Sequence, residues 1–319
     1  MIAGSYEFGE CPACGTTRAR TLRTGAELRA EFEDLWQFHL SRLREGVPLD
    51  HLLDRTFFTQ SPPLQLVTCD ACGTVYRNPR ERADRVIATY ARENTDPPTL
   101  RLLHAAHRQV ASTQARLLTQ LAGKTGTGLE VGSYVGAFLK ASAEHGWAFE
   151  GIDVNEPVNA FVRSLGHTVR TGSIEDVPAG LTFDAIAFWN CFDQLPDPRV
   201  ALRTAQRLRP GGILALRVPN GAFYERFAGG RFPPAWRRAC LAWNNLLGFP
   251  YRSGFTPTSL QRLLEAHGFE VALFRQDTLP HLPDPWARRW ARAEARIVKR
   301  LTRGRAPWFE IYARRLVSK

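Results

Sequence analysis

Short apolar runs alternate with stretches of helical period through the middle of the chain, from residue 129 onward. The runs predict strands, and the stretches between them predict helices that begin at Ala137, Val158 and Val200. The predicted strands cover residues 129–131, 150–154, 168–171, 183–189 and 213–218. This alternation predicts an α/β fold with a Rossmann-like, doubly wound, mostly parallel sheet. In such a sheet the ligand binds at the carboxyl ends of the strands.

The segment before this region has a helical pattern of its own. Residues 26–44 place leucines and aromatic side chains at helical spacing among charges, and Gly46 and Pro48 end the pattern. Further elements are predicted at 64–68 (strand), 100–121 (helix), 257–267 (helix), 270–274 (strand) and 308–313 (strand). Because Asn, Asp and two prolines interrupt the pattern at 94–98, we expect two domains, 1–95 and 96–319.

Four of the six cysteines form two pairs with a two-residue gap, and a glycine follows each pair. They are Cys11 and Cys14 before Gly15, and Cys69 and Cys72 before Gly73. This spacing lets two thiolates turn toward one ion, so the two pairs predict a four-cysteine zinc site in the amino-terminal module. With no position left for water or substrate, the zinc is expected to be structural. Disulfides are one alternative, which a reducing compartment disfavours. A redox CxxC is the other, but neither pair opens a strand-to-helix unit of the thioredoxin kind. We expect Cys191 and Cys240, unpaired in sequence, to be buried thiols.

The composition is that of a globular protein. The chain has 319 residues, of which 44% are apolar and 23% are charged, and this excludes a disordered or collagen-like chain. No apolar run approaches the roughly 18 residues that a membrane-spanning helix needs. The first residues lack the basic and apolar regions of a secretory signal, so we expect a cytoplasmic protein with no transmembrane segment.

Positive charge is concentrated near the carboxyl end. The formal net charge is +11, and residues 286–319 contribute +9 of it, eleven Lys/Arg less two Glu. Such a segment suits peripheral contact with nucleic acid, an anionic membrane or a phosphorylated substrate, or it forms a solvated helix face. Residues 285–303 predict a basic amphipathic helix. Its apolar stripe contains Trp286, Trp290, Ala293, Ile297, Val298 and Leu301. We expect this stripe to pack onto the domain in preference to a membrane surface.

A glycine-rich turn follows the first predicted strand. Gly132 and Gly136 there permit a positive φ and let a ligand approach the backbone at the start of a helix. The next strand ends at Asp153, about twenty residues later, where a carboxylate can accept both hydroxyls of a ribose. This combination suits NAD and S-adenosylmethionine (SAM) alike. No third glycine completes a GxGxxG arrangement for a pyrophosphate, whereas an acid, Glu130, stands two residues before the first glycine.

At these residues the chain resembles the class I SAM-dependent methyltransferases. The resemblance is specific over residues 129–218 and extends more loosely to the carboxyl terminus. It includes the motifs at 172–176, 188–190, 195–198, 208–212, 218–220, 254–258 and 268–269. A subset of this family bears an amino-terminal zinc module with four cysteine ligands, as this chain is expected to do.

The resemblance implies roles for individual residues. Gly132, Ser133 and Gly136 would line the methionine part of SAM, with Glu130 supporting the turn. Asp153 would hold the ribose diol. Ser173 and Ile174 would face the adenine, and Asn190 would lie near the sulfonium, mostly through its backbone.

Two positions depart from the family pattern. Tyr134 stands where the family usually has its middle glycine, so either the turn needs no positive φ there, which is the cheaper option, or the residue is strained. Asp193 and Gln194 stand where a Glu-His pair is common, and Gln194 cannot take up a proton at neutral pH. Asp193 is the nearest candidate for a general base, although a carboxylate beside a turn often caps a helix instead.

Residues 221–255 form an insertion rich in aromatic side chains. It is expected to be a lid over an acceptor pocket, or equally the core of a small subdomain. The leading function is methyl transfer from SAM to a small molecule, such as a sugar, a glycan or a lipid-linked intermediate. An RNA methyltransferase and a non-catalytic zinc- and nucleotide-binding adaptor are the alternatives.

Overall fold

The computed structural model describes residues 6–47, 65–92, 95–228, 232–242, 252–277, 287–302 and 306–316. The chain divides into two compact units, each assembled from three segments. Unit 1 consists of Met1–Ala83, Val218–Arg262 and Arg275–Phe309, and unit 2 of Asp84–Arg217, Leu263–Phe274 and Glu310–Lys319. The sequence pattern suggested two contiguous domains meeting near residue 95. Compactness instead groups the aromatic insertion and the basic helix with the cysteine-bearing module.

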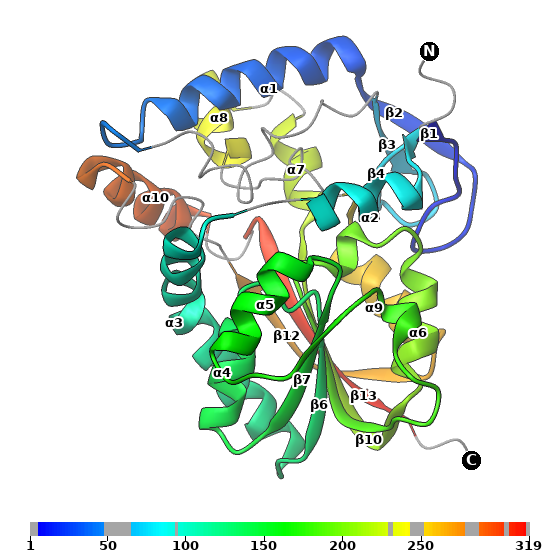
Figure 1. The fold of residues 1–319 in the computed structure, drawn as a ribbon. Coiled ribbons are helices and arrows are strands. Elements are labelled where there is room, and N and C mark those ends of the chain that lie inside the picture. Colours follow the sequence, from blue (N-terminus) through cyan, green and yellow to red (C-terminus); the bar gives the residue numbers. More distant parts are fainter. Residues whose placement is uncertain are drawn as a thin grey trace. The chain divides into compact units, whose positions relative to one another are not determined.

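The central sheet has seven strands in the order β12-β13-β10-β9-β6-β7-β8 (Figure 1). Their bounds are β6 Thr127–Val131, β7 Ala148–Asp153, β8 Val169–Thr171, β9 Phe183–Trp189, β10 Leu208–Pro219, β12 Phe269–Asp277 and β13 Trp308–Arg315. The five strands from β10 to β8 pair in parallel. The predicted α/β class and mostly parallel sheet are therefore confirmed. Because β9 and β7 flank β6, the strand order reverses at β6, where a doubly wound sheet has its ligand crevice.

The helices of unit 2 are α2 Ala83–Arg92, α3 Pro97–Ala122, α4 Ala137–Glu144, α5 Glu156–Ser164 and α6 Pro198–Ala205. Three of them, α3, α5 and α6, begin at polar caps. Helices α3, α4 and α5 lie on one side of the sheet and α6 on the other (Figure 1). Asp96, Asn155 and Asp197 cap α3, α5 and α6 through their side chains. The starts predicted at Val158 and Val200 are two residues late, because the first turn of each helix contains proline and polar residues that carry no apolar period.

Unit 1 contains a four-stranded antiparallel sheet in the order β11-β4-β3-β2. The strands are β2 Ala19–Thr24, β3 Gln65–Cys69, β4 Val75–Arg77 and β11 Ser253–Gly254, and a separate pair joins β1 Tyr6–Glu7 to β5 Arg80–Glu81. The unit also has helices α1 Gly25–Leu40, α7 Gly221–Ala228, α8 Pro234–Ala242 and α10 Arg289–Leu301; a further helix, α9, covers Pro257–Glu265. Thr24 and Glu27 form a reciprocal capping box that starts α1.

The aromatic insertion contributes to a core of its own in unit 1. Phe223, Tyr224 and Phe227 of α7 are buried in one cluster with Leu28 and Phe38 of α1. The described part of the insertion therefore packs a subdomain. Phe232 and Trp236 pack against the same cluster, and Trp243, Phe249 and Tyr251 lie outside the described residues. This packing explains why residues from both ends of the sequence belong to one unit.

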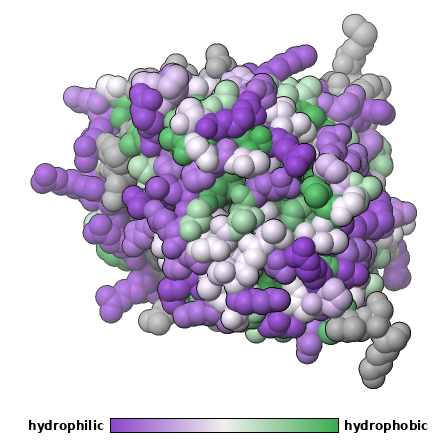
Figure 2. Space-filling view, turned by 60° about the horizontal axis from the view of Figure 1, so that its bottom comes forward, coloured by the Kyte–Doolittle hydropathy of each residue, from purple (hydrophilic) through white to green (hydrophobic). Residues whose placement is uncertain are grey.

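None of the described helices is long and apolar enough to cross a membrane. On the face shown in Figure 2, hydrophilic residues surround smaller apolar areas. Helix α10 also has exposed apolar residues: Trp290, Ile297 and Leu301 are 49%, 57% and 67% exposed. The expectation that the predicted stripe packs onto the domain is therefore wrong for these three residues. It holds for Val298, which is 5% exposed.

Candidate functional site

The turn after β6 requires glycine at both positions that the sequence singled out. Gly132 and Gly136 have φ of 69° and 70°, the left-handed region that favours glycine. A Cβ on Gly132 would lie 2.9 Å from Cβ of Cys191, and one on Gly136 would lie 2.9 Å from Cγ1 of Val162. The turn is thus tightly enclosed by side chains from the neighbouring strand end and from α5. Backbone amides here stay close to the start of α4, whose N-cap is Gly136.

Tyr134 also adopts the left-handed region, with φ of 42°. The option that this turn needs no positive φ is therefore wrong. Its backbone N–H donates to Oδ2 of Asp153 over 3.1 Å, and its ring meets His107 edge to face at 6.5 Å between centroids. These contacts offset part of the cost of placing a side chain at this angle.

Asp153 ties the glycine turn to the end of β7. Its Oδ2 accepts from the Tyr134 amide, and its Oδ1 accepts from the amide of Asn155 over 3.0 Å. Each carboxylate oxygen retains a lone pair, so the group can still accept hydrogen bonds from a ligand. Burial raises the pKa of Asp153, and the hydrogen bonds from Asn155 and Tyr134 oppose that shift. The structure thus brings together the glycine turn and the acid that the sequence placed about twenty residues apart.

Two buried polar side chains, one in β6 and one in the turn after it, each have an atom without a hydrogen-bond partner. Oε2 of Glu130 and Oγ of Ser133 have no hydrogen-bond partner, although each residue is 3% exposed. Burial raises the pKa of Glu130 well above its usual value, and the nearby Asp153 raises it further. Burying a carboxylate oxygen without a hydrogen-bond partner costs free energy. Oε2 of Glu130 therefore favours a ligand that offers it a hydrogen-bond donor or a positive charge.

The end of β8 carries the two residues expected near an adenine. Ser173 caps the short 3₁₀ helix at Ile174–Asp176, with its amide and hydroxyl donating to Asp176 over 2.7 and 2.9 Å. Ile174 is buried. The sheet order places this segment beside the end of β7, and Gly172 N–H donates to the Asp153 carbonyl over 2.9 Å.

The end of β9 is held by a chain of hydrogen bonds. Asn190 has φ of 63°, its N–H donates to the Arg217 carbonyl over 3.1 Å, and its Oδ1 accepts from the Arg217 guanidinium. Its own carbonyl accepts from Nε2 of Gln194, whose Oε1 accepts from the Tyr90 hydroxyl over 2.7 Å. The backbone at Asn190 is therefore fixed from two sides.

Sequence reasoning missed Tyr90 and Arg217. Tyr90 lies in α2 and also accepts, through its carbonyl, a hydrogen bond of 2.8 Å from Asn155. It therefore connects the ends of β7 and β9. Arg217 is fully buried near Glu310, with 4.0 Å between Nε and Oε1, and Gln114 and Tyr312 donate to the same carboxylate. The pattern marks residue 217 only as part of a strand, so this network carries no sequence signal.

Asp193 lies in the 3₁₀ helix Phe192–Gln194 and is 1% exposed. Neither of its carboxylate oxygens has a hydrogen-bond partner, and Asp197 is the residue that caps α6. The helix-cap alternative for Asp193 is therefore wrong. Burial raises its pKa well above the usual value, and the charge of Arg217 opposes that shift. A buried carboxylate with a raised pKa is suited to proton transfer.

Cys191 and Cys240 differ from each other. Cys240 is buried in the core of unit 1. Cys191 is partly exposed as a residue, whereas its thiol is buried, and this burial raises the thiol's pKa well above its usual value. Its Sγ donates to the Val131 carbonyl over 2.9 Å, against the Gly132 turn.

The four paired cysteines come together in unit 1 through the pairing of β2 with β3. Ala19 lies opposite Cys69 in that pair, so the turn that follows β3 lies beside the turn that precedes β2. Each turn is closed in the same way: the Gly15 amide donates to the Cys11 carbonyl, and the Gly73 amide to the Cys69 carbonyl, both over 2.9 Å. The two glycines have φ of 74° and 73°. The two cysteine turns thus have matching backbone geometry.

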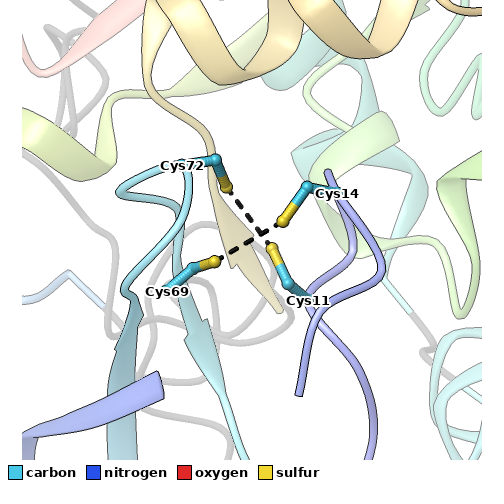
Figure 3. Close-up of side chains that lie close together, drawn as sticks. All are labelled: Cys11, Cys14, Cys69 and Cys72. Atoms are coloured by element: carbon cyan, nitrogen blue, oxygen red, sulfur yellow. Dashed lines mark hydrogen bonds between the residues drawn. The ribbon is translucent and has the colours of Figure 1, made fainter. Parts of the chain in front are cut away.

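The four sulfurs point toward one another (Figure 3). All lie within 4.8 Å of each other, and the Cys11–Cys72 and Cys14–Cys69 pairs are 3.5 Å apart. A tetrahedral zinc ion with Zn–S bonds of about 2.3 Å separates its sulfurs by roughly 3.8 Å, so this donor set fits zinc. Contact with Cys11 lowers the pKa of Cys72 to about 4, and contact with Cys72 raises that of Cys11. Among the described residues, no other group of three or more His, Cys, Asp and Glu side chains is placed to hold a metal.

Several solved structures resemble the chain. A SAM-dependent methyltransferase from Archaeoglobus fulgidus is 15% identical, with 65% of this chain and 94% of that chain covered and a TM-score of 0.45. One from Mesorhizobium loti is 19% identical, with 64% and 96% covered and a TM-score of 0.46. The [4+2]-cyclase SpnF is 18% identical, with 75% and 98% covered and a TM-score of 0.48. At such values these likenesses do not bear on function.

A search of curated protein sequences finds no match. A sequence profile described as "Methyltransferase domain" matches residues 102–273, more than half of the chain. The matched segment contains the glycine turn, Asp153 and the ends of β8 and β9 described above. The chain therefore belongs to this methyltransferase-domain family.

Proposed function

We propose that the protein is a SAM-dependent methyltransferase that acts on a small molecule. The observation that supports this most is the junction of the Gly132 turn with Asp153, at the point where the strand order of the sheet reverses. This arrangement offers backbone amides and a carboxylate, and it lacks the third glycine that a dinucleotide pyrophosphate needs. Methyltransferase-domain membership agrees with this choice.

Each predicted cofactor residue has a proposed contact. Asp153 would accept from the ribose hydroxyls, because its oxygens keep free lone pairs. Gly132, Ser133 and Gly136 would line the methionine part of SAM. The unpaired Oε2 of Glu130 would support the turn beside the positive charge of that part of the cofactor. Ser173 and Ile174 would border the adenine. Asn190 would present backbone beside the sulfonium.

SAM, when bound, supplies an electrophilic methyl group for in-line displacement, and positioning provides much of the catalysis. The chain would contribute by positioning the end of β9, since Arg217 and Gln194 hold Asn190 through hydrogen bonds. Asp193 would take the proton from the acceptor, because its carboxylate is buried, unpaired and has a raised pKa. The charge of Arg217 opposes the rise in the Asp193 pKa and so favours the ionised form, which is the form that can accept a proton.

We also propose that the four cysteines hold one structural zinc ion. The matched turns and the sulfur spacing support this assignment. All four ligands would come from protein, which leaves no position for a reacting water. The ion would fix β2 to the turn between β3 and β4 in unit 1.

The acceptor class is proposed as a sugar, a glycan or a lipid-linked intermediate. Comparing metabolites of a deletion strain and its parent, both fed methyl-labelled methionine, would identify the compound that loses its label. Loss of label from RNA alone would instead support the alternative RNA methyltransferase. No change in any compound, together with tight SAM binding, would support a non-catalytic adaptor.

The cofactor assignment is tested by calorimetric titration of SAM into Asp153→Ala. Losing a charged acceptor for two hydroxyls is expected to weaken binding about 100-fold or more. Asp184→Ala is the matched control, because Asp184 also accepts from a backbone amide, that of Thr127, but at the opposite end of the sheet. Equal SAM affinity in Asp153→Ala and the wild type would refute the assignment.

A further inference from the structure

Helix α10 (Arg289–Leu301) has one face that packs into unit 1. Ala291 and Val298, seven residues apart, are 1% and 5% exposed. The helix's acidic residue, Glu294, is paired on the same side with Arg42, with two contacts of 2.6 Å between guanidinium and carboxylate. These contacts therefore attach the helix to unit 1.

A second face carries large apolar side chains that the described residues of unit 1 cover only in part: the Arg42 guanidinium lies over the Trp290 ring, 5.1 Å from its centroid. Trp290, Ile297 and Leu301 follow the spacing i, i+7, i+11, so they form one stripe along the helix. They are 49%, 57% and 67% exposed. Exposed large apolar residues are ordinary when scattered, but an aligned stripe on one helix indicates a contact surface.

A third face carries three arginines. Arg289, Arg296 and Arg300 repeat the same spacing one position earlier, so their stripe is rotated by about 100° from the apolar one. All three are exposed, and none forms an ion pair with another described residue. The helix thus presents an apolar stripe and a parallel basic stripe, side by side, to its surroundings.

The two stripes together select among possible partners. Nucleic acid would pair with the arginines but leave Trp290, Ile297 and Leu301 in water. Core packing is already provided by Ala291 and Val298. An anionic lipid surface satisfies both stripes, because apolar side chains enter the boundary between headgroups and acyl chains while arginines reach the phosphates.

We propose that α10 is an interfacial helix that binds unit 1 to an anionic lipid bilayer. The helix would lie in the plane of the interface with Trp290, Ile297 and Leu301 inserted and Arg289, Arg296 and Arg300 at the headgroups. Its 13 residues are too short to span a bilayer, which takes about 20. The proposal is independent of the methyltransferase assignment, since it involves neither SAM nor the crevice of the central sheet.

The test is co-sedimentation of the full-length protein with vesicles, without SAM. We expect binding to vesicles of phosphatidylcholine with one third phosphatidylglycerol. Binding should be about 30-fold weaker in Arg296→Gln/Arg300→Gln, because each arginine near an anionic surface contributes about 1 kcal/mol. Ile297→Gln/Leu301→Gln is expected to weaken binding at least about tenfold, from lost apolar burial. Leu165→Gln, at a residue 40% exposed on another part of the chain, should bind like the wild type.

Three outcomes would overturn the proposal. The first is equal binding of the wild type and Ile297→Gln/Leu301→Gln to the anionic vesicles. The second is no vesicle binding, with RNA bound instead in a salt-dependent way. The third is no vesicle binding, with a dimer that Ile297→Gln/Leu301→Gln converts to a monomer. Thermal unfolding of each variant shows whether the fold is intact, because substitutions at exposed positions are expected to change stability little.

Discussion

Replacing Gly132 by alanine tests the geometry of the cofactor turn. Its φ of 69° places an alanine in the left-handed region, which costs about 1–2 kcal/mol. The new Cβ would also lie 2.9 Å from Cβ and 3.0 Å from Sγ of Cys191. Overpacking of this kind costs about 1–3 kcal/mol more. The expected total loss of unfolding free energy is thus about 2–5 kcal/mol.

Gly166→Ala separates the two contributions. Gly166 has φ of 86°, and a Cβ there would meet nothing within 4 Å, so only the backbone cost applies. Urea unfolding should show Gly132→Ala to be less stable than Gly166→Ala by about 1–3 kcal/mol. SAM titration should show weaker binding for Gly132→Ala alone. Equal destabilisation by both substitutions, with equal SAM affinity, would refute the account of this turn.

Three further predictions concern buried charge and the metal. The pKa of Glu130 is raised in the folded state, so the folded protein binds this proton more tightly than the unfolded chain does. The wild type should therefore lose stability as pH rises from the pKa of Glu130 in the unfolded chain to its pKa in the folded protein, and Glu130→Gln should not show this loss. Parallel plots of unfolding free energy against pH for the two proteins, from pH 4 upward, would contradict the shift. Cys69→Ser should lose zinc by mass spectrometry, whereas Cys240→Ser should keep one ion per chain; retention in both variants would exclude a four-cysteine site. Glu310→Gln should lower the unfolding free energy by about 3–5 kcal/mol, because it removes the carboxylate that lies 4.0 Å from Nε of the buried Arg217. A loss below about 1 kcal/mol in urea would show that the pair contributes little.

The sequence predicts the central sheet because its strands are buried and therefore continuous apolar runs. Phe183–Trp189 was expected and is observed with the same bounds. By contrast, β2 reads Ala-Arg-Thr-Leu-Arg-Thr and lies at the edge of its sheet, so its polar residues carry no strand signal. The short strand β11 pairs with β4, which lies far from it in the sequence, and a local pattern cannot indicate such a pairing.

The candidate site could be predicted in part. Gly132 and Asp153 are identified by their spacing along alternating elements, and the structure joins them through the Tyr134 amide. The contribution of Tyr90 depends on a long-range contact with Gln194, over 100 residues away, and has no local signature. Tyr134 shows the reverse case, where propensity disfavours a positive φ that the surrounding contacts nevertheless impose.

The most direct test of the central claim is a calorimetric comparison of SAM and NAD on the same purified protein. We expect SAM to bind with one site per chain, S-adenosylhomocysteine to compete for that site, and NAD to release no heat of binding. Saturable binding of NAD, with none of SAM, would contradict the account.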